Sequence, residues 1–129
     1  MKYEDLIGVP FIDGGRDKSG MDCWGLAREM YRRQGIDIPD YHVSAVSAVS
    51  VASQMGVDVA YWQKLAQPAL GCLVLIRLSP DVWANHVGIY IGDGKFIHAY
   101  SATGVSIGRL RRWRSRIVGF YVPKKGGRP

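Results

Sequence analysis

Cys23 is the residue of this sequence best placed to act as a nucleophile. Asp22, directly before it, can cap a helix, so the helix would begin at the cysteine. Backbone N–H groups and the macrodipole at a helix N-terminus favour an anion, so we expect the thiol pKa to fall below its free value of about 8.5. The same N–H groups can stabilise the oxyanion that forms when a carbonyl is attacked. The alternative is that Cys23 is a small residue of the buried core.

His86 and His98 flank a predicted β-hairpin whose turn contains Gly92, Asp93 and Gly94. A two-residue turn, Asp93-Gly94, would put the two imidazole rings on opposite faces of the hairpin. A three-residue turn, Gly92 to Gly94, puts them on one face as diagonal neighbours within about 8 Å, with Gly94 left-handed in a bulge. We predict the three-residue turn.

The face that carries the two histidines is predicted to lie against the helix that begins at Cys23. His98 would stand opposite Gly88, which has no side chain and leaves room for the second ring. Tyr90 and Phe96 would share this face. Apolar residues would line the other face of the hairpin: Val87, Ile89, Ile91 and Ile97.

Brought together, these three side chains would form a catalytic triad. Cys23 would be the nucleophile, His86 the base, and His98 the residue that orients the base. Either histidine alone is more simply a hydrogen-bonded sheet residue. Zinc is the other use for one cysteine and two histidines, but Cys23 is 63 residues from His86 and there is no C-x-x-C or H-x-x-x-H pair. We therefore expect no metal and no organic cofactor. His42 has no visible partner and is expected at the surface.

The elements that must position these residues can be read from apolar spacing. A helix is predicted from Cys23 to a left-handed cap at Gly35, because its apolar positions form one stripe: Cys23, Leu26, Ala27, Met30 and Tyr31. Residues 11–21 are predicted to be a loop, and residues 43–55 and 59–65 to be helices. Five strands are expected over 72–78, 86–92, 95–100, 105–108 and 117–122. Helices first and strands later imply an α+β domain with an antiparallel sheet.

Composition narrows the class of protein. The 129 residues suffice for one core, and no apolar run approaches the length of a membrane span. The first ten residues include Glu4 and Asp5 and have no apolar core, so we expect no secretory signal and no disulfide. Net charge is +6, but residues 1–60 carry 6 basic and 9 acidic groups, whereas residues 61–129 carry 11 and 2. Such a basic half can bind a polyanion or simply be a solvated face.

Three motifs in order resemble the NlpC family of cell-wall cysteine peptidases, which are papain-like in fold. They are Asp22-Cys23-Trp24-Gly25-Leu26, Asn85-His86-Val87-Gly88-Ile89-Tyr90-Ile91-Gly92 and Phe96-Ile97-His98-Ala99. The order Cys, His, His and the 12-residue step between the histidines also match. The resemblance covers residues 1–122 as a single domain and leaves a basic tail over residues 123–129.

The resemblance implies a cysteine endopeptidase that hydrolyses peptidoglycan stem peptides, with Cys23, His86 and His98 in the roles given above. Family members typically cleave between D-γ-glutamate and a diamino acid. The stretch from Asp13 to Tyr31, with Ile38-Pro39-Asp40-Tyr41, looks most like members encoded by phages and prophages near tail genes. That branch implies phage tail proteins as partners. It also implies synthesis in the cytoplasm and delivery to the wall by a virion or lysis system.

Three positions depart from the family pattern. Trp24 stands where family members usually have a Ser after the cysteine. In those relatives the Ser, with the preceding Asp (here Asp22), helps to hold the free amine of the substrate. Phe11 stands where a Tyr commonly lines the site. Cys72 replaces an Asp and is expected to be a buried structural residue. We expect Asp22, Trp24, Phe11 and Asn85 to contact the substrate.

Other functions fit the same sequence. The first is a phage tail assembly or structural protein that keeps the fold with little or no activity. The second is an acyltransferase or amidase, although permuted acyltransferases of this superfamily place His before Cys. The third is a nucleic-acid binder, which we do not expect because no aromatic stacking platform accompanies the basic residues.

Overall fold

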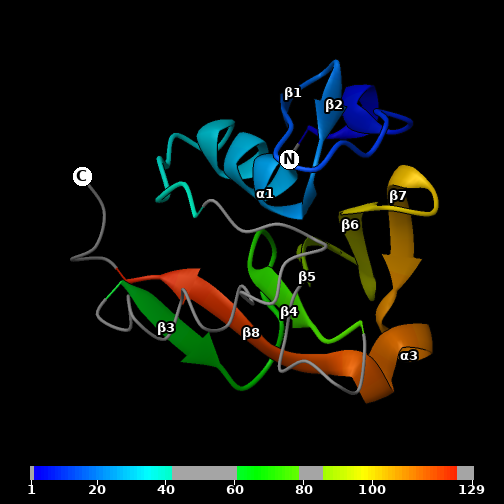
Figure 1. Ribbon diagram of the computed structural model, residues 1–129. Helices are drawn as coiled ribbons and strands as arrows, with labels where there is room; N and C mark the ends of the chain where they lie inside the picture. The colour runs from blue at the N-terminus through cyan, green and yellow to red at the C-terminus, as the bar shows by residue number, and fades with distance from the viewer. Residues whose placement is uncertain (1, 42–60, 79–85, 125–129) are drawn as a thin grey trace.

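The computed structural model describes residues 2–41, 61–78 and 86–124 of the chain. One helix, α1 (Cys23–Arg32), precedes a six-stranded sheet in the order β3-β8-β4-β5-β6-β7, in which every neighbouring pair is antiparallel. The strands are β3 (Trp62–Leu65), β4 (Leu73–Ile76), β5 (His86–Gly92), β6 (Lys95–Tyr100), β7 (Gly104–Arg109) and β8 (Ile117–Pro123). Figure 1 shows α1 against the sheet, where it packs mainly on β5 and β6. The predicted α+β class is confirmed.

The helix forms where the sequence predicts it. The Asp22 side chain accepts a hydrogen bond from the Gly25 N–H at 2.8 Å, and this satisfies a donor that the first helical turn leaves open. Gly35 has a φ of +79°, and the next N–H, of Ile36, donates to the Tyr31 carbonyl. All five residues of the predicted apolar stripe are buried.

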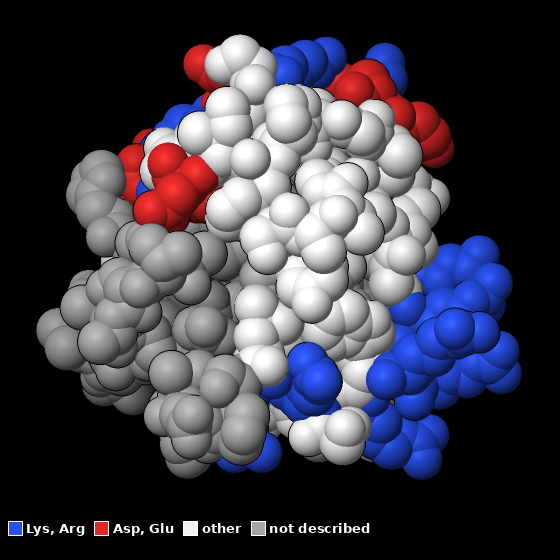
Figure 2. Space-filling view, turned by 45° about the vertical axis from the view of Figure 1, so that its right-hand side comes forward, with Lys and Arg blue, Asp and Glu red and all other residues white. Residues whose placement is uncertain are grey.

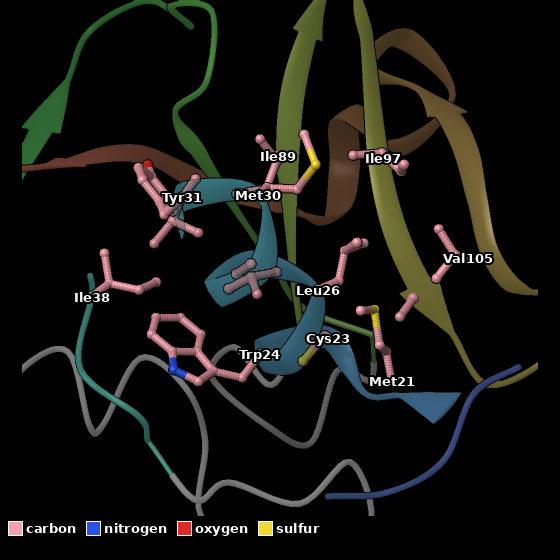
Figure 3. Packing of buried hydrophobic residues seen from close by; sticks show 14 of the residues in the cluster. Met21, Cys23, Trp24, Leu26, Met30, Tyr31, Ile38, Ile89, Ile97 and Val105 are labelled. Carbon is pink, nitrogen blue, oxygen red and sulfur yellow. The ribbon is translucent and has the colours of Figure 1, made fainter. Parts of the chain in front are cut away.

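The sheet has an apolar core on each face. The first lies between the helix and the sheet, where Leu26 and Met30 of α1 meet Ile89 of β5 and Ile97 of β6 (Figure 3). The second core lies on the opposite face, around Val74, Ile76 and Phe96. It is flanked by side chains of the short helix α3 (Leu110–Trp113), which joins β7 to β8 through the 3-10 turn η2 (Arg114–Arg116).

Some local predictions are wrong. The helix predicted over 59–65 is instead strand β3 over Trp62–Leu65, which pairs with β8 from Trp62↔Pro123 to Leu65↔Phe120. Its hydrogen-bonding partner lies far along the chain, so local periodicity does not reveal it. The loop predicted over 11–21 contains two paired two-residue strands, β1 (Arg16–Asp17) and β2 (Gly20–Met21), and a 3-10 turn, η1 (Glu4–Leu6), lies before it. The helix predicted over 43–55 and the residue His42 lie outside the described residues.

The β5–β6 hairpin has the predicted register but not the predicted turn. Ile89 pairs with Ile97 and Tyr90 with Phe96, and this is the register that puts the histidines on one face. The turn itself has two residues, Asp93 and Gly94, with φ of 55° and 71°. The register shifts between Tyr90 and Gly92, so the extra residue is a bulge in β5 before the turn.

Candidate active site

His86 and His98 are hydrogen-bonded to each other on one face of the sheet. Nε2 of His86 lies 2.8 Å from Nδ1 of His98, and the two side chains are only 3% and 2% exposed. Gly88 is needed for this contact, because a Cβ there would lie 2.7 Å from Phe96 Cδ2 and 3.3 Å from the Cβ of His98. The predicted meeting of the two imidazoles is therefore confirmed.

Aromatic rings enclose His98. Phe96 lies edge-on to it at 4.8 Å between ring centroids, and Tyr100 stacks on it at 5.6 Å with an interplanar angle of 10°. Trp113 of α3 contacts His98 edge-on at 5.2 Å. Tyr100 could have been predicted, since it is two residues from His98 on a strand, but Trp113 reaches the site from a helix that no sequence pattern indicated.

Cys23 opens α1 beside the beginning of β5. It is 4% exposed, and backbone N–H groups of Val87 and Trp24 face its sulfur and favour the thiolate. Val87 directly follows His86, so the sulfur of Cys23 faces the residue next to His86 on β5. The hydrogen bonds of the described residues nevertheless do not include one between the Cys23 thiol and His86.

The histidine face does not cover the helix, contrary to the prediction. The core between α1 and the sheet contains Val87, Ile89, Ile97 and Ala99, whereas His98 packs with Phe96 on the other face. Strand alternation explains the outcome, since the apolar face of the hairpin is the one that complements the apolar stripe of α1. Cys23 and His86 therefore approach each other only at the first residues of their elements.

Burial makes all three candidate catalytic groups neutral. Loss of water around the sulfur, followed by the negative charge of Asp22, raises the pKa of the Cys23 thiol to about 12, despite the N–H groups that oppose this shift. The expected lowering of the thiol pKa is therefore wrong for this conformation. Burial, with a smaller contribution from His98, lowers the pKa of His86 to about 3, and burial lowers that of His98 to about 4.

The neutral histidine pair leaves one nitrogen of the right kind for a base. If the Nε2–H of His86 donates to Nδ1 of His98, then Nδ1 of His86 carries a lone pair. That Nδ1 makes no hydrogen bond among the described residues. The pair can thus accept a proton at His86 and stabilise the resulting imidazolium through His98.

Asp22 is committed to the structure of the site. Its Oδ1 accepts from the Gly25 N–H and from Arg16 Nη1 at 2.6 Å, and its Oδ2 accepts from the Gly14 N–H at 2.9 Å. Asp22 is 1% exposed. Arg16 pairs with both Asp22 and Asp40. These ion pairs join the loop before the helix to the N-terminus of α1 and to the segment that follows the helix. The predicted role of Asp22 in holding a substrate amine stays a prediction.

The other residues predicted to bind substrate are Trp24, Phe11 and Asn85, and the structure describes the first two. Trp24 is fully buried, donates its Nε1–H to the Pro39 carbonyl at 2.8 Å, and stacks on Tyr41 at 4.8 Å. Phe11 is half-buried and forms an isolated bridge with Met21. Asn85 lies outside the described residues. Cys72 is a fully buried free cysteine, as predicted.

Two features are absent from the described residues. No group of three or more His, Cys, Asp or Glu side chains is placed to hold a metal ion among residues 2–41, 61–78 and 86–124. In the same part of the chain, no helix is both long enough and apolar enough to cross a membrane.

Known proteins share both the sequence and the fold. The chain is 32% identical over 118 residues to the Escherichia coli K12 protein named murein DD-endopeptidase MepS/murein LD-carboxypeptidase, covering 89% of this chain and 56% of the relative. It is 32% identical over 119 residues to the probable peptidoglycan endopeptidase LytE of Bacillus subtilis, covering 88% of this chain and 30% of that protein. The chain thus spans about half the length of the first relative and less of the second.

A solved structure gives the same result. The crystal structure of the NlpC/p60 domain of the peptidoglycan hydrolase SagA matches with a TM-score of 0.63 at 28% identity, covering 92% of this chain and 90% of that domain. The relatives are peptidoglycan endopeptidases or hydrolases, and members of their family are cysteine peptidases. The model of the NlpC/P60 family matches residues 8–122, and this chain belongs to that family.

Proposed function

We propose that this protein is a cysteine peptidase of peptidoglycan stem peptides, with Cys23 as nucleophile, His86 as base and His98 as the residue that orients the base. The observation that carries the proposal is the 2.8 Å contact between Nε2 of His86 and Nδ1 of His98, close to the helix N-terminus that bears Cys23. The contact leaves Nδ1 of His86 to act as base. Family membership supports the same roles.

The reaction proceeds through an acyl-enzyme. The Cys23 thiol gives its proton to Nδ1 of His86 while the sulfur attacks the amide carbonyl, and the new oxyanion accepts hydrogen bonds from N–H groups at the start of α1. His86 then protonates the leaving amine as the C–N bond breaks. Water, deprotonated by His86, cleaves the thioester and restores the thiol. His98 stabilises the imidazolium in both steps.

The resting state requires a rearrangement before attack. Cys23 and His86 are 4% and 3% exposed and share no hydrogen bond. Substrate entry must therefore bring the thiol and Nδ1 of His86 into contact. The neutral thiol and neutral imidazole make His86 a true general base, rather than one half of a preformed ion pair.

The bond that we propose is cleaved is the one between D-γ-glutamate and the diamino acid. The protein would be encoded by a phage or prophage, and the phage tail would deliver it to the wall. Resemblance of residues 13–31 to such members supports this assignment. The printed names of the relatives differ on the bond: one is a murein DD-endopeptidase and another, from Bacillus subtilis, a gamma-DL-glutamyl hydrolase. Cleavage products therefore have to decide between them.

The experiment incubates purified protein with isolated muropeptides and identifies the products by mass spectrometry. We expect loss of the diamino acid and all residues beyond it, leaving an L-Ala–D-Glu stub. Release of monomers from cross-linked dimers would replace the proposed bond with the D,D bond. Cys23→Ala should abolish product formation, and Cys72→Ala, which removes the other buried thiol, should not. Equal cleavage by Cys23→Ala would contradict the assignment of the nucleophile.

A second candidate function is a structural or assembly protein of a phage tail. The burial of Cys23, His86 and His98, with a thiol pKa of about 12, favours it, because an inert core would have these properties. Such a protein would give no product from any muropeptide. Its Cys23 would also stay unmodified by iodoacetamide in the presence of wall fragments, whereas an enzyme should become reactive when substrate opens the site.

A further inference from the structure

Five arginines gather on one surface beside the candidate active site. They lie on the end of β7, on α3 and on η2, all are exposed, and we refer to them as the arginine cluster: Arg109, Arg111, Arg112, Arg114 and Arg116. Figure 2 shows a large area of Lys and Arg side chains on its right-hand side, the side of the molecule where α3 lies in Figure 1. The cluster accounts for most of the positive charge of the described C-terminal half.

No carboxylate among the described residues forms an ion pair with the arginine cluster. Every ion pair of the described residues uses a cation between Arg16 and Arg33 and a carboxylate between Asp5 and Asp40. None of the five cluster arginines forms one. Among the described residues, Arg116 donates to the Leu78 carbonyl and lies 5.9 Å from the Trp113 ring. Like charges this close repel, so an external anion would be favoured.

The surface is also hollowed where three of these arginines meet. A depression of about 370 Å³ is lined by Arg109, Arg111 and Arg114, together with Leu110, Gly94 and Asp93. Guanidinium groups bind phosphate oxygens in a two-pronged geometry and keep their charge at any relevant pH. The repulsive carboxylate of Asp93 in the wall of this hollow is outnumbered by three cations. The hollow therefore suits one phosphate group, with Arg112 and Arg116 left for its neighbours along a polymer.

The choice of polymer follows from what the cluster lacks. Single-stranded nucleic acid is bound with exposed aromatic rings on which bases stack, and none of the large exposed apolar side chains of the described residues is aromatic. Trp113, the aromatic residue of α3, packs edge-on against Phe96, His98 and Tyr100 instead. With four residues, α3 is also too short to read a groove of duplex DNA.

We propose that the arginine cluster binds an anionic wall polymer with closely spaced phosphodiester groups, and that this contact holds the protein against the wall it cuts. The location in the wall rests on the proposed function, whereas binding of the polymer does not. Because Trp113 contacts both Arg116 and His98, the bound polymer would lie beside the candidate active site.

The test measures binding of purified full-length protein to a poly(glycerol phosphate) chain by isothermal titration calorimetry at several salt concentrations. The variant Arg109→Gln/Arg111→Gln/Arg114→Gln removes the three cations of the hollow. The matched control, Lys2→Gln/Lys64→Gln/Lys124→Gln, removes three exposed charges located elsewhere. We expect at least tenfold weaker binding and a smaller salt dependence for the arginine variant, and less than a threefold change for the control.

Three results would overturn the proposal. The first is equal weakening by both variants, which would mean binding by net charge alone. The second is no measurable binding of the unmodified protein at a low salt concentration of about 50 mM. The third is tenfold tighter binding to a single-stranded oligonucleotide of equal charge, which would make nucleic acid the partner. Circular dichroism checks that each variant is folded.

Failure of the proposed function gives a different pattern. Cys23→Ala should bind the polymer as well as the unmodified protein does, and the arginine variant should cleave small soluble muropeptides at the normal rate. Loss of cleavage with retained binding would contradict only the peptidase assignment. Loss of binding with retained cleavage of soluble muropeptides would contradict only the role of the cluster.

Discussion

Nε2 of His86 and Nδ1 of His98 lie 2.8 Å apart in a buried, aromatic environment. One nitrogen must donate and the other accept, since burial lowers the pKa of both rings and keeps them neutral. A donor at His86 Nε2 places the accepting lone pair of that ring on Nδ1. In that tautomer, Nδ1 is the nitrogen of His86 that can serve as the base.

His98→Asn should preserve this relationship and His98→Ala should destroy it. The amide oxygen of Asn can stand near the position of Nδ1 and accept from His86 Nε2–H, whereas Ala offers no acceptor. We expect kcat/KM for muropeptide hydrolysis within about tenfold of normal for Asn, and about 100-fold lower or more for Ala. Similar losses in both variants would show that the orienting hydrogen bond is not what His98 contributes.

The same histidines should make the folded state sensitive to mild acid. Their pKa is about 6.5 when unfolded and about 3 and about 4 when folded, so between these values only the unfolded chain binds the protons. The contribution of the two neutral histidines to the free energy of unfolding should therefore be fully present above pH 6.5. It should fall as pH is lowered, by up to about 1.4 kcal/mol per pH unit for each histidine. Urea unfolding at pH 7 and pH 5 measures this difference.

His98→Asn supplies the control for the pH effect, because it removes one of the two titrating rings. The loss of stability between pH 7 and pH 5 should be clearly smaller in this variant than in the unmodified protein. Carboxylates ordinarily titrate below this window. An unchanged or larger loss would mean that groups other than this pair cause the effect.

Alkylation of Cys23 should be slow in the resting protein. With a thiol pKa of about 12, only about one molecule in 10⁵ carries the thiolate at pH 7, against about one in 100 for a pKa of 9. In a Cys72→Ala background, we expect the iodoacetamide rate followed by mass spectrometry to rise about tenfold per pH unit. A rate at pH 7 equal to that of free cysteine would show an open site with a stabilised thiolate.

Much of the site was accessible from the sequence because it rests on local rules. Asp22 caps α1 and Gly35 ends it, and each follows from residue type at a helix end. The meeting of His86 and His98 follows from strand alternation once the register is right. The predicted three-residue turn is wrong because a bulge at Ile91 gives the same register as a longer loop. The alternation of side chains does not distinguish a bulge from a longer loop.

The features that the sequence does not predict depend on contacts between residues that are far apart along the chain. The face of the hairpin that covers α1 is chosen by packing between Ile89, Ile97 and the helix, and strand β3 exists because β8 pairs with it. The thiol pKa was predicted from the helix dipole, which is a local effect. Burial of Cys23 and the charge of Asp22 outweigh it, and both depend on how the loop before the helix folds back.

Asp22 should stabilise the fold through its ion pair with Arg16, and its negative charge should also suppress the reactivity of Cys23. Asp22→Ala removes a helix cap and leaves a half-buried guanidinium with one fewer partner, so we expect a loss of about 3 kcal/mol in the free energy of unfolding. Asp37→Ala is the matched control, because this carboxylate is 77% exposed and pairs with Arg28, and it should cost less than about 1 kcal/mol.

Asp22→Asn separates the charge from the cap. An Asn side chain still accepts from the Gly25 N–H, but it removes the negative charge that raises the pKa of the Cys23 thiol. We therefore expect a lower thiol pKa and faster alkylation than in the unmodified protein at the same pH, with α1 intact by circular dichroism. Slower or unchanged alkylation in a folded Asp22→Asn protein would show that burial alone sets the reactivity of Cys23.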